Sequence, residues 1–118
     1  MSNPRVDLPV WIERLLKHGS YSCSETEYVK FRQELLREQV LEVANAHENG
    51  RIRLHEACLQ HLADSDDNVV RNALSCLFVI GGSTDVQAVE ALLQQPSEVV
   101  RKAARTCHFE IRRRPTET

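Results

Sequence analysis

The chain has 118 residues, of which 42% are hydrophobic, 27% charged and only 5% aromatic, which is ordinary for a globular domain and unlike collagen-like or disordered chains. It contains no apolar run of about 20 residues and no apolar signal core near Met1, so we expect a cytoplasmic protein without a membrane span. The net charge of −2 is too small for the electrostatic footprint of a nucleic-acid-binding domain.

Two helices are expected in the first part of the chain. A short one begins at Pro9, after Asp7, and ends near Gly19. A longer one follows Ser24-Glu25-Thr26-Glu27, which is a capping-box pattern, and its apolar period stops at Asn49-Gly50. Most of the few aromatic residues lie in this part, and we expect them to cap an aliphatic core; they are Trp11, Tyr21, Tyr28 and Phe31.

Four more helices are expected in the remainder. The helical period restarts at Arg51, which begins the third helix. The fourth helix begins in Asp64-Ser65-Asp66-Asp67-Asn68, a run rich in capping residues, and it stops at Gly81-Gly82. Ser83 or Thr84 is expected to cap the fifth helix, and Gln95-Pro96-Ser97 ends it and begins the sixth. With few glycines, few prolines and little strand-like alternation, the chain is predicted to be all-α.

An internal repeat relates these helices. At an offset of 30 residues, Val69-Val70-Arg71-Asn72-Ala73 aligns with Val99-Val100-Arg101-Lys102-Ala103, with four identities in five positions. A two-helix unit of this length is therefore present about two and a half times. Its structural residues are expected to be Val70, Arg71, Ala73, Val100, Arg101 and Ala103: the apolar ones pack one helix on its neighbour, and the arginines hydrogen-bond an adjacent turn.

The run from Asp66 to Ala73, followed by a Gly-Gly break and a second apolar helix, resembles the HEAT repeat of the bilin-lyase type, and Glu98 to Ala104 is similar. The resemblance covers residues 64–107 and is weak over 24–63. It implies a single domain, a short right-handed α-solenoid of antiparallel helix pairs. Its parts would be an N-terminal cap (1–23), about two and a half repeats (24–111) and a basic disordered tail (112–118). HEAT solenoids are mostly binding scaffolds, so the resemblance also implies protein–protein interaction rather than catalysis.

The small net charge conceals two unlike segments, because residues 54–98 carry one basic and seven acidic side chains, whereas residues 99–118 carry six and two. We identify the candidate partner-binding residues from these segments: Glu56, Asp64, Asp66, Asp67, Asp85 and Glu90 on the acidic side, and Arg101, Arg105 and Arg112 on the basic side. The last three belong to a predicted basic stripe on the final helix that includes His108.

These charges lead to three functional hypotheses. In the first, the acidic surface steers a basic protein toward a small bacterial protein that binds and regulates, neutralises or chaperones it, for example an immunity protein masking a toxin domain. In the second, the basic last helix serves a nucleic-acid or phosphoprotein adaptor. In the third, which follows from the resemblance, the chain is an accessory to bilin or tetrapyrrole attachment. The oligomeric state stays open.

We expect no enzyme activity, cofactor or metal site. The dipeptides His47-Glu48 and His55-Glu56 are similar to the iron-binding pairs of deoxyhypusine hydroxylases, a HEAT-type family, but that family has four pairs at one repeat distance, whereas these two are 8 residues apart. His55, Cys58 and His61 share only part of a helical face. No nucleophile elbow or phosphate-binding loop is present. The cysteines, with no CxxC pair, are expected to be buried apolar residues; they are Cys23, Cys58, Cys76 and Cys107.

Overall fold

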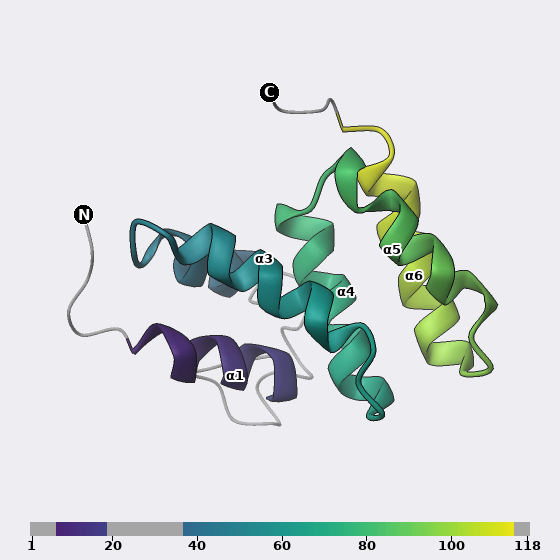
Figure 1. The fold of residues 1–118 in the computed structure, drawn as a ribbon, viewed down its shortest axis with the longest axis horizontal. Helices are drawn as coiled ribbons and strands as arrows, with labels where there is room; N and C mark the ends of the chain where they lie inside the picture. The colour runs from purple at the N-terminus through teal and green to yellow at the C-terminus, as the bar shows by residue number, and fades with distance from the viewer. Residues whose placement is uncertain (1–6, 19–36, 115–118) are drawn as a thin grey trace.

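The structure, a computed structural model, describes residues 7–18 and 37–114, and within these ranges it is helical without a strand (Figure 1), which confirms the all-α prediction. No helix in these ranges has the length and apolarity needed to cross a membrane. The α-helices are α1 (Leu8–His18), residues 37–45, α3 (Gly50–His61), α4 (Asp67–Ile80), α5 (Val86–Glu90) and α6 (Glu98–Ile111); the 3-10 helices are η1 (Ser83–Asp85) and η2 (Ala91–Gln94).

Some expectations concern residues outside the described ranges. These are the capping box at Ser24 to Glu27, the first part of the long second helix, most of the aromatic cap including Tyr21, Tyr28 and Phe31, the thiol of Cys23, and the tail from residue 115 onward.

Helix α4 lies at the centre of the fold, where it contacts α1, α3 and α6 (Figure 1). Its apolar side chains recur every three or four residues, and Val70, Ala73, Leu74 and Leu77 are at most 4% exposed. Burying a leucine or valine side chain contributes roughly 1.5–3 kcal/mol, so this stripe drives the packing of α4 on its neighbours. One buried cluster runs from α1 to α6 through these contacts.

A buried polar side chain also joins α1 to α4. Asn72 is 3% exposed, and its Nδ2 donates to the main-chain oxygen of Leu16 at 2.7 Å. Because the last carbonyls of an α-helix have no partner within the helix, this bond satisfies one of them at the end of α1.

The helix starts follow the capping residues in the sequence. The Oδ1 of Asp66 accepts from the Asn68 N–H at 2.9 Å at the start of α4, and the Oγ of Ser97 accepts from the Val100 N–H at 3.4 Å at the start of α6. Each bond satisfies one of the free N–H groups of a first helical turn. The predicted beginnings of these two helices are therefore confirmed.

The fifth helix differs from its prediction. A continuous helix capped by Ser83 or Thr84 was expected, but α5 is a short α-helix between the 3-10 helices η1 and η2. The capping group is the carboxylate of Asp85, whose Oδ2 accepts from the Gly82 N–H at 3.0 Å and closes a tight first turn. At the other end Pro96 forces Gln95 into an extended conformation, and the last turn narrows to 3-10 form before it.

Two arginines from distant parts of the chain cap the C-terminal end of α4. Arg114 donates to the main-chain oxygens of Gly81 (2.7 Å), Val79 (3.4 Å) and Phe78, and Arg51 donates to that of Ile80 at 3.4 Å. Positive charge at this end also complements the helix dipole. The expectation that a disordered tail begins at residue 112 is therefore wrong for Arg114, because its side chain bonds main-chain oxygens of residues that lie 33 to 36 positions earlier in the sequence.

The repeat-structural residues lie largely where the repeat places them. Val70, Ala73 and Val100 are buried, and Ala103 and Arg71 are half-buried. Arg101 donates through Nη1 to the main-chain oxygens of Gln95 and Pro96, both at 2.8 Å, so its predicted bond to an adjacent turn is confirmed.

Candidate functional site

Three of the acidic candidates lie in the turn between α3 and α4, where two of them shape the turn. The Oδ1 of Asp64 accepts a hydrogen bond from the Asp66 N–H at 2.8 Å, and its Oδ2 lies 3.2 Å from Nδ1 of His61. These two interactions hold the pKa of the Asp64 carboxyl below its ordinary value. Asp66 caps α4, as described above, and Asp67 is exposed in its first turn. The local structure therefore already uses two of the three carboxylates.

The remaining acidic candidates do not join that turn. Asp85 is 4% exposed, so its assignment to a partner-binding surface is wrong: its Oδ1 lies 2.7 Å from Nε2 of His55 and its Oδ2 accepts from Gly82. Glu90 lies 3.4 Å from Nε2 of His108 and thereby joins α5 to α6. Glu56 is exposed on α3. These three acidic residues thus lie at three separate places in the fold, apart from the turn before α4.

The basic candidates separate into two groups. Arg101 is held by the loop before α6, and the side chain of His108 is only 16% exposed beside Glu90, so these two do not extend the predicted basic stripe into solvent. Arg105 and Arg112 are exposed. Two ion pairs at a spacing of four residues also involve this helix, Glu98 with Lys102 and Glu110 with Arg114, both at 3.3 Å.

The exposed side of α6 combines apolar and basic groups. Val99 is 44% exposed and Phe109 is 53% exposed, and the guanidinium carbons of Arg112 and Arg113 lie 5.3 and 5.2 Å from the centre of the Phe109 ring. Both distances are within the range of a cation–π interaction. We call this surface the α6 outer face and define it by Val99, Lys102, Arg105, Thr106, Phe109, Arg112 and Arg113, all exposed.

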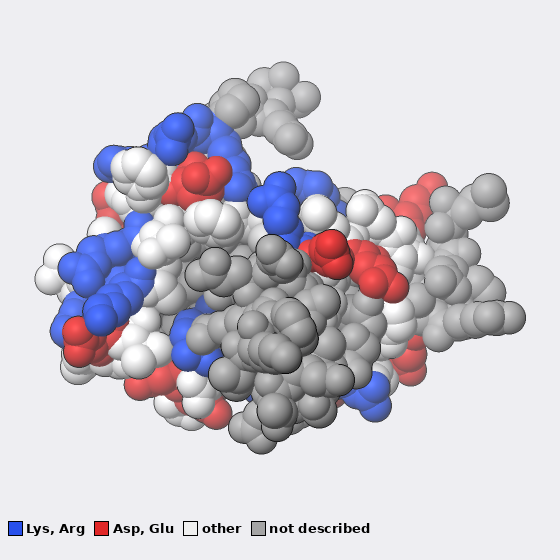
Figure 2. Space-filling model, turned by 180° about the vertical axis from the view of Figure 1, so that it is seen from behind, with Lys and Arg blue, Asp and Glu red and all other residues white. Residues whose placement is uncertain are grey.

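Three charges of the α6 outer face have no carboxylate partner among the described residues. Lys102 pairs with Glu98, whereas no ion pair of the described residues includes Arg105, Arg112 or Arg113. Figure 2 shows Lys and Arg side chains gathered over α6 at the left of that view. An aromatic ring surrounded by available guanidinium groups can pack on apolar groups and attract carboxylates at the same time.

Sequence reasoning missed Phe109 as a member of this face. The signal was present, because Val100, Ala104, Cys107 and Ile111 define the buried side of the helix and Phe109 lies opposite them on a helical period of 3.6 residues. A large aromatic residue placed away from the core stripe is the observation that could have identified it.

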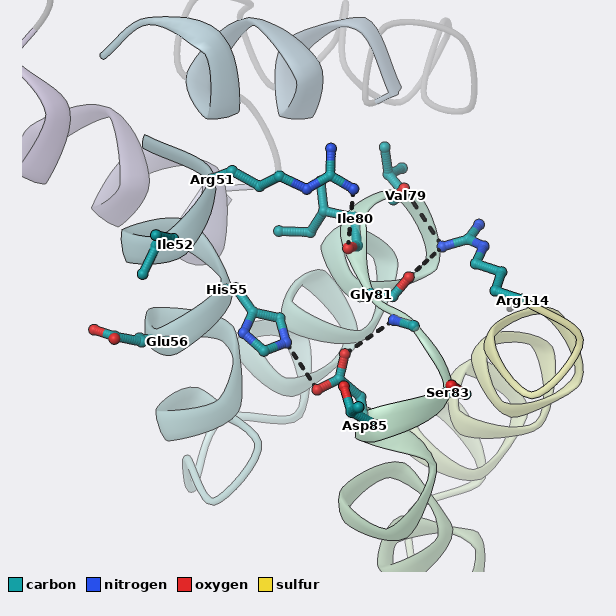
Figure 3. A pocket seen from close by; sticks show the side chains of 12 residues that line it. Arg51, Ile52, His55, Glu56, Val79, Ile80, Gly81, Ser83, Asp85 and Arg114 are labelled. Carbon is teal, nitrogen blue, oxygen red and sulfur yellow. Dashed lines mark hydrogen bonds and ion pairs between the residues drawn. The ribbon is translucent and has the colours of Figure 1, made fainter. Parts of the chain in front are cut away.

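A hollow of about 450 Å³ lies between α3 and the loop that follows α4 (Figure 3). Arg51 and His55 line it from α3, Asp85 from η1 and Arg114 from the turn after α6. His55 points toward Asp85, and both arginines point toward the carbonyl end of α4 (Figure 3). The polar groups around this hollow thus bond largely to one another and join α3, α4 and the chain after α6.

The histidines and cysteines considered for metal binding do not converge. His55 faces Asp85, His61 faces Asp64, and among the described residues no three His, Cys, Asp or Glu side chains are placed to hold a metal ion. Three free thiols are buried, as predicted for core cysteines: Cys58, Cys76 and Cys107. A hydrogen bond to Cys76, together with burial, raises the pKa of Cys58 well above its ordinary value, and burial raises the pKa of Cys107 to about 12.

Comparison of the sequence with protein-family models and with curated proteins, and of the structure with solved structures, finds no match.

Proposed function

We propose that the chain is a non-catalytic protein-binding module of HEAT-like architecture and that the α6 outer face docks an acidic segment of a partner protein. The observation that carries the proposal is the exposed Phe109 ring, flanked by Arg112 and Arg113 and lying on the same helix face as Val99. Exposed apolar side chains with a charged surround are found at protein interaction sites, and aromatic and arginine residues are enriched where binding energy concentrates.

The packing of the helices supports the HEAT-like part of the proposal. Helices α4 and α6 carry the two copies of the repeated sequence, and they pack on each other. In both units the helix that precedes the repeated box packs on it, α3 on α4 and α5 on α6. This recurrence is the arrangement expected of stacked helix pairs.

The choice of an acidic protein over the basic partner of the first hypothesis rests on where the charges lie. Asp64 and Asp66 serve the turn before α4, Asp85 is buried, and Glu90 faces His108. Arg105, Arg112 and Arg113, by contrast, share one helix face and have no carboxylate partner among the described residues. Asp67 and Glu56 are exposed but lie on different helices, whereas the exposed charges that share one helix face are basic and attract carboxylates.

The same charges favour a protein over a nucleic acid. Three arginines without an ion pair among the described residues, on a chain of net charge −2, offer few phosphate contacts, whereas a duplex presents one negative charge per about 1.7 Å. Burying the apolar area of Phe109 and Val99 against apolar side chains of a protein lowers the free energy of the complex.

Free buried thiols are typical of reducing compartments. We therefore propose a cytoplasmic location for this module, where it would regulate, neutralise or chaperone its partner.

The test compares capture of proteins from the source cell by the immobilised chain and by variants. The double variant Phe109→Ala/Arg113→Gln removes the centre of the face, and Arg53→Gln, an exposed arginine on α3, is the matched control. A protein partner should be retained by the original chain and by the control, and lose about tenfold or more in affinity with the double variant. Its binding should weaken as salt rises and survive nuclease treatment. Equal capture by all three chains, or loss on nuclease treatment, would overturn the proposal.

A further inference from the structure

The repeat indicates what kind of element fits the α6 outer face. Val99, Lys102 and Thr106 correspond, 30 residues earlier, to Val69, Asn72 and Cys76 on α4. On α4 these three positions are 6%, 3% and 0% exposed, whereas on α6 all three are exposed. The same face of the repeated helix is therefore covered in one unit and open in the other.

Helices cover this face on α4. Asn72 donates to the main-chain oxygen of Leu16 at the end of α1, and Cys76 is fully buried in the same core cluster as Cys58 of α3. Both α1 and α3 pack on α4. In the part of the chain that the structure describes, the corresponding face of α6 has no such cover, and its residues there are Lys102 and Thr106 rather than Asn72 and Cys76.

We infer that the occupant of the α6 outer face is an acidic amphipathic helix of the partner protein. This inference rests on the proposed function and specifies the partner's secondary structure and charge. Val99, Lys102, Thr106, Phe109 and Arg113 follow one another at steps of three and four residues, so they form a ridge along α6 on which a second helix can pack.

The chemistry of the ridge defines the partner helix. Its apolar residues, at spacings of three and four, contact Val99 and the Phe109 ring. Carboxylates on the flanks of its apolar stripe meet Arg105, Arg112 and Arg113. The guanidinium groups of Arg112 and Arg113 already lie beside the ring, so a helix that covers Phe109 also brings its carboxylates near both.

The test uses the intact chain and three fluorescent peptides. The first is an acidic amphipathic helix with Leu along one stripe and Glu on both flanks. The second has the same composition in an order that spreads Leu around the helix, and the third has Lys in place of Glu. We expect the first peptide to bind at least about tenfold more tightly than either control. Phe109→Ala and Arg113→Gln should each weaken its binding, and Arg53→Gln should not.

Several outcomes would overturn the inference. Equal binding of the first two peptides would show that charge alone is recognised. An acidic helix would be excluded as the preferred occupant if the first peptide did not bind, or if a single-stranded oligonucleotide bound more tightly than it does. Self-association of the chain in sedimentation experiments that is abolished by Arg113→Gln would assign the face to a second copy.

A crosslink separates this inference from the proposed function. A photo-crosslinking residue in place of Thr106 should attach to the captured partner within a helix rich in Glu and Asp. Attachment within an extended or loop segment would overturn the inference and leave the protein-binding function intact. Failure of the capture experiment itself would instead refute the proposed function.

Discussion

Arg114 makes three long-range hydrogen bonds. It donates to three main-chain oxygens at the end of α4 and lies 3.3 Å from Glu110, with its side chain 26% exposed. A hydrogen bond to a charged group contributes about 1.5–3 kcal/mol, because its loss leaves a partly buried acceptor without a donor.

We therefore expect Arg114→Ala to lower the free energy of unfolding by about 1.5–3 kcal/mol. Arg114→Lys should lie between this variant and the original chain, since an ammonium group cannot reproduce a planar fork of donors. The exposed neighbour Arg113 gives the matched control, and Arg113→Ala should change stability by less than about 0.5 kcal/mol. Urea unfolding followed by circular dichroism measures all three, and equal effects at positions 113 and 114 would contradict this account.

Asp64 makes stability depend on pH. Its folded-state pKa is lowered by the Asp66 N–H and by His61, so its ionised form favours the folded state at pH values above the unfolded pKa of about 3.9. That contribution is lost as the pH falls through the folded pKa. We expect the original chain to be more stable than Asp64→Asn at pH 7 and the difference to shrink as the pH drops below about 4. Thermal melts over this pH range measure the difference in stability. Glu48 is exposed before α3, so Glu48→Gln controls for the loss of a surface charge.

The end of α4 depends on close backbone packing at one of two adjacent glycines. A Cβ added to Gly81 would lie 2.5 Å from the main-chain oxygen of Leu77 and 3.1 Å from Oδ2 of Asp85, whereas one added to Gly82 would meet no atom within 4 Å. The Gly-Gly pair, which in the sequence marks only a helix stop, therefore contains one position with a packing requirement and one without.

We predict that Gly81→Ala destabilises the protein by about 1–3 kcal/mol, because the main-chain contact can be relieved only by moving the backbone. Gly82→Ala should be neutral or stabilising by up to about 1 kcal/mol, since alanine reduces the conformational entropy of the unfolded chain. Chemical denaturation of the two variants side by side provides the measurement. A larger loss from Gly82→Ala than from Gly81→Ala would show that the turn is packed differently.

The core joins α1, α3, α4 and α6 in one buried cluster, which includes the thiols of Cys58, Cys76 and Cys107. All three thiols are buried, which limits their access to reagents, and the raised pKa values of Cys58 and Cys107 keep these two largely protonated at pH 8. One shared core also favours cooperative unfolding of the helices that contribute to it.

We expect these three cysteines to react slowly with a thiol reagent in the folded chain and to become reactive together as the chain unfolds. Peptide mapping after labelling at increasing urea should give one midpoint for all three, equal to that measured by circular dichroism. A Cys23→Ser background removes the fourth thiol from the signal. Labelling of Cys107 at lower urea than Cys58 would show that α6 detaches before the rest of the core unfolds.

The all-α class of the described chain was predictable because its signals are local. The helix beginnings at Asp66 and Ser97 follow from side chains that bond N–H groups two or three residues away, and the buried stripe of α4 follows from its helical period. The candidate site was predictable only in part: Arg105 and Arg112 were identified as exposed cations, whereas Phe109 was not recognised as the centre of their surface.

Local sequence patterns thus determined the helical class of the described chain and the beginnings of α4 and α6. The fate of individual charges was decided only by tertiary structure. Asp85 is buried because His55, 30 residues away, and the Gly82 N–H bond its two oxygens, and Arg114 is anchored because α6 brings it to the end of α4. An ionised side chain is buried only where distant groups replace its hydration, and the spacing of residues along the sequence does not contain that information.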